Sequence, residues 1–208
     1  MTRAPVQKRS REKKRKIIVA GMKLFSDKGF HQTGVSEITS EAKVSVGTFY
    51  SYFKDKKELF DQVMEAYAAS ITKGVYGNLA QEAPYKKSPE EIINYIVETA
   101  RQAHSLSTEL HREMLALKNR EQLMAELDLA IVNSLQKGIA EIMTRCGDKI
   151  RVKEIDSSAR LISGAIEETM HRCLLENNEP DMENIFSQLT EMCTVYLFKQ
   201  QILRDKYL

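Results

Sequence analysis

The stretch VSVGTFYSYFKDKKELF, Val44 to Phe60, decides the fold of this chain. It places four aromatic rings within five residues, interleaves them with small polar residues and ends in a basic run. Phe49 and Phe53 are four residues apart and share one helical face, which we expect to be buried. Tyr50 falls about 100° further around the helix, so it can point elsewhere. The stretch predicts a short helix that keeps part of its aromatic surface exposed.

A second short helix precedes this one, and the pair predicts a helix-turn-helix. We expect the helices at about 35–42 and 46–53. The second begins with Ser45, Val46, Gly47 and Thr48, whose small side chains allow a close approach to a surface. Free backbone N–H groups and the positive end of the helix dipole favour phosphate at such a position. Serine and threonine hydroxyls can donate to phosphates or base edges, and the threonine methyl can contact thymine.

The remaining rings and lysines of the stretch fit the edge of a nucleic-acid interface. Tyrosine has an apolar body and a polar tip, so Tyr50 and Tyr52 can lie at the border of the core and donate to phosphate. Both could equally be ordinary half-buried core tyrosines. Lys54 and Lys56 follow where the helix would leave the groove and meet the DNA backbone.

Apolar residues recur at helical spacing along the whole chain, and no segment has the pattern of a strand. Gly29 is expected to end the first helix. Asp55, Ser88 with Pro89, and Asp181 have the pattern of helix starts. The expected fold class is all-α with about nine helices, at 11–28, 35–42, 46–53, 56–76, 89–105, 108–118, 120–146, 155–176 and 182–205.

Charge is distributed unevenly along the 208 residues, although the net charge is only +2. Residues 1–73 carry 15 Lys and Arg against 8 Asp and Glu, which gives +7. Residues 74–208 carry 16 against 21, which gives −5. The first 16 residues are especially basic, so we expect residues 1–10 to form a flexible arm that binds phosphate rather than a merely solvated surface.

Composition also indicates the compartment. No apolar run approaches 18 residues, so we expect no membrane span, and no apolar segment of a secretory signal follows the basic N-terminus. The three cysteines, Cys146, Cys173 and Cys193, are far apart, which suits buried thiols in a reducing compartment. The expected location is the cytoplasm, and a redox role for the cysteines stays open.

Residues 11–64 resemble the DNA-binding domain of the tetracycline-repressor (TetR) family of bacterial transcription regulators. The resemblance is carried by the segments AGMKLFSDKGF, TGVSEITSEAKVSVGTFYSYF and KDKKELF. It implies an N-terminal DNA-binding domain at 11–57, with the motif at about 35–53, and a ligand-binding and dimerisation domain at 58–208. The residues after the match resemble the family only in length and helical character.

The resemblance also implies roles for single residues. Together with the residue pattern described above, it gives a DNA-contacting set of Thr33, Ser36, Lys43, Ser45, Val46, Gly47, Thr48, Tyr50, Tyr52, Lys54 and Lys56. Two positions depart from the family pattern. Lys43 stands where a glycine is usual, so it must adopt a glycine-like backbone or a different turn, at a cost of about 1 kcal/mol. Gly34 stands where serine or threonine is common, so one capping contact to phosphate is not expected from its side chain.

The last two helices would pair with their copies in a second subunit, as in the family. Both 155–176 and 182–205 carry apolar stripes, which could also belong to the core of the single chain. Helices between 89 and 146 would enclose a small-molecule cavity. Candidate liners are Tyr67, Tyr95, His104, His111, Met114, Met143 and Met170, although methionines often only fill gaps in a core. We expect no metal, since His104 and His111 have no third ligand at a useful spacing, and no cofactor.

The leading hypothesis is a cytoplasmic homodimeric repressor that binds a palindromic double-stranded DNA operator and is released by a small molecule. A transcriptional activator of the same fold is an alternative, and so is a basic protein that binds DNA or a membrane surface without sequence preference. An enzyme is not expected, because the chain has no nucleophile elbow, phosphate loop or paired zinc histidines. The sequence does not identify the effector, the operator or the regulated genes.

Overall fold

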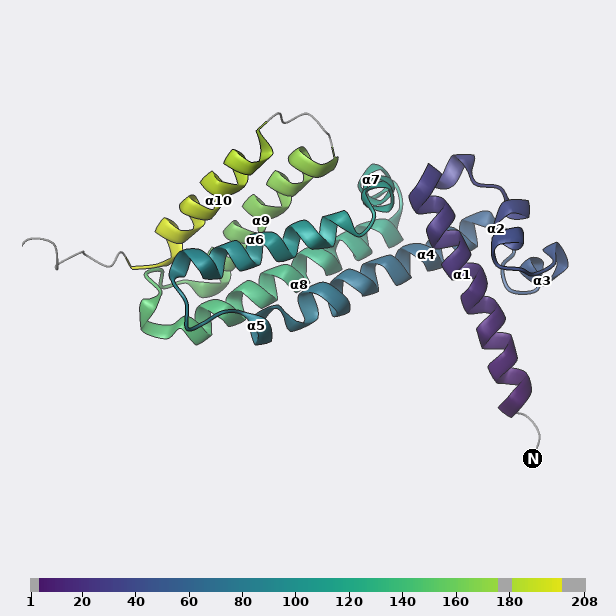
Figure 1. Cartoon of the computed structure of the whole chain (residues 1–208), viewed down its shortest axis with the longest axis horizontal. Helices are drawn as coiled ribbons and strands as arrows, with labels where there is room; N and C mark the ends of the chain where they lie inside the picture. Colours follow the sequence, from purple (N-terminus) through teal and green to yellow (C-terminus); the bar gives the residue numbers. More distant parts are fainter. Residues whose placement is uncertain (1–3, 176–180, 200–208) are drawn as a thin grey trace, which may run out of the picture. The chain divides into compact units, whose positions relative to one another are not determined.

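The computed structural model describes residues 4–175 and 181–199, and every structural statement below concerns these residues. Figure 1 shows the elements in chain order. The α-helices are α1 (Ala4–Gln32), α2 (Val35–Glu41), α3 (Val46–Tyr50), α4 (Lys56–Ala69), α5 (Leu79–Glu82), α6 (Pro89–Ser105), α7 (Thr108–Leu117), α8 (Gln122–Cys146), α9 (Ile155–Met170) and α10 (Met182–Leu197). The structure also has two π-helical turns, η1 (Ser70–Val75) and η4 (His171–Leu175). Two 3₁₀ turns are η2 (Tyr76–Asn78) and η3 (Gly147–Lys149).

The all-α prediction is confirmed. Each expected helix has a counterpart, and α5 is an additional single turn inside the expected loop at 77–87. The only β pairing within the described ranges is one antiparallel bridge between Ile150 and Phe198. None of the helices drawn in Figure 1 combines the length and the apolar character needed to cross a bilayer.

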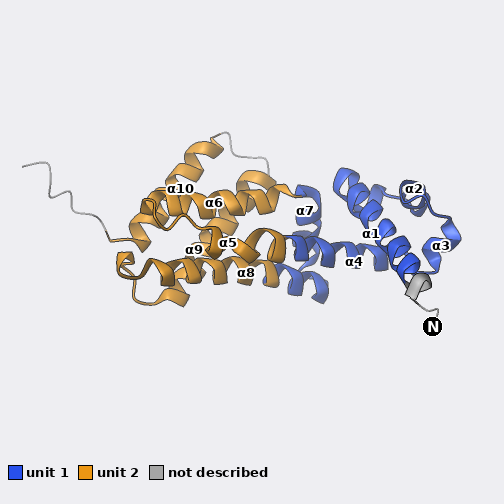
Figure 2. Cartoon of the chain, turned by 60° about the horizontal axis from the view of Figure 1, so that its bottom comes forward, with its two compact units in different colours: residues 1–70, 107–129 blue, residues 71–106, 130–208 orange. Residues whose placement is uncertain are grey.

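The chain divides into two compact units, coloured separately in Figure 2. Unit 1 comprises residues 1–70 and 107–129, and unit 2 comprises residues 71–106 and 130–208. Unit 1 therefore contains α4 and α7 in addition to the three helices expected for a DNA-binding domain.

The start of α1 differs from expectation. Residues 4–10, expected as part of a flexible arm, form its first turns, and residues 1–3 lie outside the described part. Pro5 suits a first helical turn, where its missing N–H would have no helical partner. The lysines and arginines that follow are good helix formers, so charge density here does not oppose helix formation.

The end of α1 follows the expectation for Gly29. This residue has φ 79° and ψ 168°, which interrupts the helical geometry. The chain then turns so that Phe30 packs on Phe60, with ring centroids 4.8 Å apart, and on Phe25 at 5.8 Å. In unit 1, α1 packs on α4 and α7 around fully buried side chains such as Ile17 and Phe25.

Unit 2 has a separate core, in which α10 packs on α6 and α9. Ile92, Ile96, Ile166 and Cys193 are at most 1% exposed. Burying one large apolar side chain contributes roughly 1.5–3 kcal/mol, so these helix contacts dominate the stability of the unit.

The predicted helix starts are present. The Oγ of Ser88 accepts from the Glu91 backbone N–H at 3.2 Å, and the Glu91 carboxylate accepts from the Ser88 N–H at 3.0 Å. Asp55 Oδ1 accepts from the Glu58 N–H at 2.8 Å. Asp181 occupies the N-cap position of α10, but its side chain makes no capping hydrogen bond.

Candidate nucleic-acid interface

The turn between α2 and α3 ends α2 in a Schellman motif. The N–H of Val44 donates to the Thr39 carbonyl at 3.0 Å, and the N–H of Lys43 donates to the Ser40 carbonyl at 3.1 Å. Lys43 has φ 55° and is the only residue other than glycine with positive φ in the described chain. It therefore takes the left-handed conformation that this motif usually assigns to glycine. The sequence left two alternatives for Lys43, a glycine-like backbone or a different turn, and the structure has the glycine-like backbone.

The first turn of α3 is held by its own hydroxyls. Ser45 Oγ accepts from the Thr48 backbone N–H at 3.1 Å and lies 2.9 Å from Thr48 Oγ1. A side chain added at Gly47 would meet only Ser45 Oγ, at 4.0 Å, so the space in front of this turn is open. These short polar residues thus fix the helix start without covering it.

The two faces of the helix separate as expected. Phe49 and Phe53 are buried together with Ile38 of α2, and their rings lie 5.5 Å apart. Val46 and Tyr50 remain 46% and 55% exposed. An exposed apolar side chain can contact a thymine methyl, and an exposed tyrosine can donate to phosphate.

Two residues of the expected DNA-contacting set point into the domain. Thr33 is 1% exposed, and its hydroxyl donates to the Gly29 carbonyl at 2.8 Å. The expectation that the Thr33 side chain contacts phosphate is therefore corrected: the hydroxyl closes the turn after α1. Tyr52 is half-buried, and its hydroxyl lies 3.0 Å from Ser10 Oγ of α1.

Lys56 also has an internal role. Its Nζ donates to the carbonyls of Phe30 and Thr33 at 2.7 and 2.9 Å and lies 4.2 Å from the centre of the Phe30 ring. The lysine thus ties the start of α4 to the chain segment before α2. Ser36 and Lys54 are exposed.

The start of α2 shows how the chain compensates for Gly34 at the N-cap position. Glu37 Oε2 accepts from the Gly34 N–H at 2.8 Å, while Glu37 Oε1 accepts from Lys28 Nζ at 2.5 Å. Both contacts favour the ionised form and lower the pKa of Glu37. The Glu37 carboxylate thus supplies the half of a capping box that accepts from the N-cap N–H, whereas Gly34 has no side chain to supply the other half.

A basic hollow of about 390 Å³ lies between α1 and the end of α2. Its lining includes Arg15, Lys16, Lys23 and Lys43, with Glu41 as the single acid. That acid pairs with Lys23 at 2.7 Å, and the hydrogen bond raises the pKa of the lysine. The surplus positive charge at this place suits a phosphate backbone.

The candidate effector residues are divided between the units. In unit 1, Tyr67 and His111 are buried, with Oη 3.1 Å from Nδ1, and Met114 is buried on α7. In unit 2, His104, Met143 and Met170 are buried and Tyr95 is half-buried.

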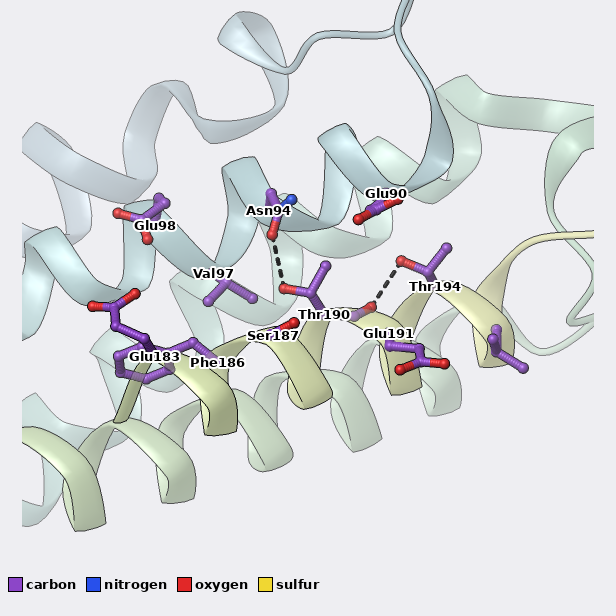
Figure 3. A pocket seen from close by; sticks show the side chains of 11 residues that line it. Glu90, Asn94, Val97, Glu98, Glu183, Phe186, Ser187, Thr190, Glu191 and Thr194 are labelled. Carbon is purple, nitrogen blue, oxygen red and sulfur yellow. Dashed lines mark hydrogen bonds between the residues drawn. The ribbon is translucent and has the colours of Figure 1, made fainter. Parts of the chain in front are cut away.

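A groove of about 450 Å³ lies between α6 and α10 and is shown in Figure 3. It is lined by Glu90, Glu98, Glu183 and Glu191 around Asn94, Phe186 and Thr190. Thr190 Oγ1 donates to Asn94 Oδ1 at 2.9 Å across the two helices. None of the candidate effector residues lines this groove. Four carboxylates at its rim favour a cationic or neutral ligand over an anionic one.

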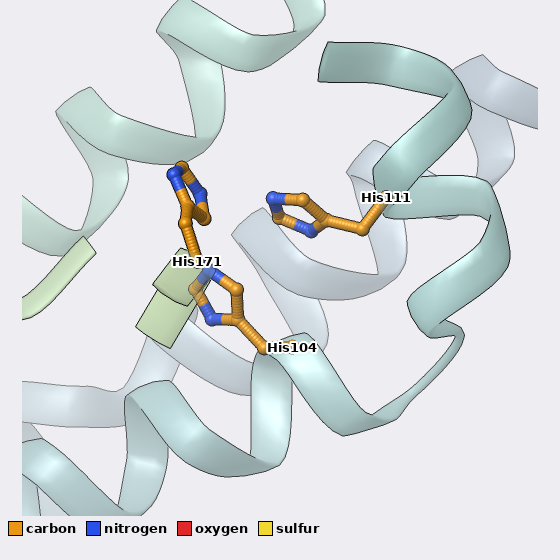
Figure 4. Close-up of side chains that lie close together, drawn as sticks. All are labelled: His104, His111 and His171. Atoms are coloured by element: carbon orange, nitrogen blue, oxygen red, sulfur yellow. The ribbon is translucent and has the colours of Figure 1, made fainter. Parts of the chain in front are cut away.

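Sequence reasoning missed two residues of unit 2 that lie beside His104. Glu167, 6% exposed on α9, has its Oε2 3.4 Å from His104 Nε2. The ring of His171, at the start of η4, lies beside the His104 ring, as Figure 4 shows. The spacing of Glu167 and His171, four residues apart on one helical face, was a signal in the sequence. Their partner on α6 could be found only from the fold.

Comparisons with known proteins agree with this arrangement. Residues 17–63 match the family model for bacterial regulatory proteins of the tetR family, and residues 88–197 match the model for the tetracyclin repressor-like C-terminal domain. The second match alone spans more than half of the chain. The chain belongs to the TetR family and is a transcriptional regulator.

One relative and two solved structures extend over nearly the whole chain. A fatty acid metabolism regulator protein from Bacillus subtilis is 23% identical over 89% of this chain and 95% of its own length. The structure of FadR from Bacillus subtilis in complex with stearoyl-CoA has a TM-score of 0.60 at 20% identity and covers 87% of this chain and 97% of that one. FadR from Bacillus halodurans, a fatty acid degradation regulator, has a TM-score of 0.62 at 19% identity, with coverages of 88% and 94%. At 20% and 19% identity, the two structures support the fold of this chain and nothing beyond it.

Proposed function

We propose that this chain is a cytoplasmic homodimeric repressor that binds a palindromic operator through α3 and is released by a small molecule. The observation that carries the proposal is the pair of faces on α3. Phe49 fixes the helix in the core, while Val46 and Tyr50 stay exposed beside an open first turn. The basic hollow at α1 and α2 supplies charge for the adjacent phosphates.

A dimer follows from the size of this surface. A helix of five residues, Val46–Tyr50, can contact few bases, so two copies one turn of duplex apart would combine their binding energies and read a palindrome. The apolar stripe of α9 expected from the sequence is largely buried inside the chain, with Ala159 and Ile166 at 0% exposure. Leu161, Met192 and Val195 of α9 and α10 are 64%, 52% and 44% exposed and form the proposed subunit contact. Gly164 lies on the same helix with open space around it, which would allow a second helix to approach closely.

Fatty acyl thioesters are the first effector class to test, because the relatives are named for fatty acid metabolism and one was solved with stearoyl-CoA. The groove between α6 and α10 is an unfavourable place for the phosphates of such a ligand, since four glutamates line it. We therefore expect any acyl-CoA to engage other parts of the chain. Release of DNA would be a population shift toward a state in which the two α3 helices no longer match the duplex spacing.

The test is selection of bound duplexes from random DNA at fixed salt, followed by footprinting. The expected result is a palindrome whose halves are about one helical turn apart. Acyl-CoAs of graded chain length are then titrated into the complex, with free CoA as the control. Binding that depends on salt but not on sequence would refute the operator, and a selected site that no metabolite releases would refute the effector response.

A further inference from the structure

Three side chains with metal-ligating atoms converge inside unit 2. They are His104 at the end of α6, Glu167 near the end of α9 and His171 at the start of η4. His104 Nε2 lies 3.4 Å from Glu167 Oε2, and His171 Nε2 lies 3.6 Å from the same oxygen. Figure 4 shows the His104 and His171 rings approaching from different helices, with centroids 5.3 Å apart.

The hydrogen bonding of His104 determines which nitrogen faces the carboxylate. Its Nδ1 lies 2.9 Å from the Ala100 carbonyl oxygen, which can only accept, so Nδ1 carries the hydrogen. In the tautomer with its hydrogen on Nδ1, the ring directs the lone pair of Nε2 toward Glu167 Oε2. A cation between the two atoms would make this approach favourable. Histidines that bind metals commonly donate their other ring N–H to a backbone carbonyl in this way.

The distances are compatible with one ion held between the ligand atoms. Separations of 3.4 and 3.6 Å are longer than the usual range for N–H···O bonds. In a tetrahedral zinc site with bonds of about 2.0–2.1 Å, neighbouring ligand atoms are about 3.3 Å apart. One ring nitrogen of His104 and one of His171 also lie within 4.8 Å of each other.

We propose that His104 Nε2, His171 Nε2 and Glu167 Oε2 bind one divalent cation of the zinc class. Imidazole nitrogens favour zinc and its neighbours over magnesium and calcium, which prefer sites made only of oxygens. Three protein ligands leave a fourth tetrahedral position for water. This site is separate from the small-molecule response proposed above and does not depend on it.

The surroundings support the carboxylate as well. Tyr76 Oη, buried in the same unit, donates to Glu167 Oε1 at 3.4 Å, which leaves Oε2 directed at the imidazoles. Hydrogen bonds of this kind orient ligating carboxylates. Glu167 is 6% exposed, so its carboxylate oxygens lie in the interior beside the two imidazoles.

Isothermal titration of the full chain, first treated with chelator, with Zn²⁺ tests the site. We expect one ion per chain, a rise in melting temperature with Zn²⁺ and none with Mg²⁺. Binding of Co²⁺ should give the visible absorption bands of a tetrahedral ion. His171→Ala and Glu167→Gln should each weaken Zn²⁺ binding by roughly a hundredfold or more, at or beyond the upper range for loss of a group that only supports a ligand.

His31→Ala is the matched control, because His31 is exposed on α1 and lies outside unit 2. It should bind Zn²⁺ as the parent protein does. Circular dichroism of each variant in the absence of metal verifies that it is folded. If His171→Ala unfolds, Glu167→Gln still tests the site, because it preserves side-chain size. A parent protein that takes up no Zn²⁺, or one whose Zn²⁺ affinity survives both substitutions, would overturn the proposal and leave protonated imidazoles as the cations facing Glu167.

Discussion

The ring of Tyr50 lies edge-on to the ring of Phe49, with centroids 5.2 Å apart and planes at 84°. Phe49 is fully buried, whereas Tyr50 is 55% exposed. The buried ring therefore fixes the position of the exposed one, and the cost of ordering Tyr50 before it meets DNA is reduced. This relationship leads to the first prediction.

Tyr50→Ala should weaken operator binding roughly tenfold or more, which corresponds to about 1.4 kcal/mol. The free energy of unfolding should change by no more than about 1 kcal/mol, because only the contact of the exposed Tyr50 ring with Phe49 is lost. Fluorescence anisotropy with the selected duplex at fixed salt measures the first quantity, and urea unfolding measures the second. Tyr50→Phe separates the hydroxyl from the ring. Unchanged affinity in the alanine variant would contradict the docking of α3.

Deleting residues 1–9 should reduce the salt dependence of DNA binding. The deletion removes Arg3, Lys8 and Arg9 and retains Ser10, which contacts Tyr52. Each phosphate contact contributes about 0.9 to the slope of log K against log salt, so the slope should fall by up to about 3. Ser10→Ala is the control for the tie to Tyr52 and should preserve the slope. Identical slopes in the truncated and full chains would show that these cations do not contact DNA.

Lys43→Gly should preserve or raise stability, by up to about 1 kcal/mol, since relief of the left-handed strain at φ 55° competes with the greater chain entropy of glycine. Lys43→Ala retains the left-handed strain, so its stability should not rise. Lys43→Asn accepts the left-handed backbone but removes the charge, so any common loss of DNA affinity in the three variants reports the charge. Thermal unfolding compares the melting temperatures of the three variants with that of the parent chain. A clear drop in melting temperature for the glycine variant would contradict the inference that the Lys43 backbone is strained.

The stability of the chain should fall at alkaline pH because of Cys193. Burial raises the pKa of this thiol from 9.0 to about 11. The folded state therefore keeps its proton where the unfolded chain has released it, so this contribution is complete below pH 9 and is lost as pH rises toward 11. Urea unfolding across this window should show a steeper decline for the parent chain than for Cys193→Ala, by up to about 1.4 kcal/mol per pH unit. Equal declines in the unfolding free energy of the two proteins would show that Cys193 does not cause the alkaline loss of stability.

Leu161→Glu in α9 should dissociate the proposed dimer, because it places a charge in an apolar subunit contact. Leu129→Glu in α8 is the matched control, since Leu129 is 58% exposed but lies in unit 1. Sedimentation equilibrium should show the mass of one chain for the first variant and of two for the second. A parent protein with the mass of one chain at micromolar concentration would refute the dimer itself.

The fold was largely predictable because helical periodicity and capping are local properties. Ser88 with Glu91, and Asp55 with Glu58, form their caps as the sequence indicated. The start of α1 was less predictable, because a dense run of charge is typical of flexible segments, whereas lysine and arginine also favour helices.

The candidate site was predictable where it depends on one helix face. The buried and exposed faces of α3 followed from the spacing of Phe49, Tyr50 and Phe53. Thr33 differed, because the direction of its hydroxyl depends on the break at Gly29. His104 and Glu167 lie on helices that are far apart in the sequence, so no local sequence pattern could predict their contact.

The brevity of α3 has a consequence for how regulators of this kind diversify. With five residues, one of them committed to the core, almost every other position is available to alter the preferred base sequence without disturbing the scaffold. A handful of substitutions could then redirect the protein to a new promoter, and descendants of one ancestor could part ways in their targets long before their folds diverge.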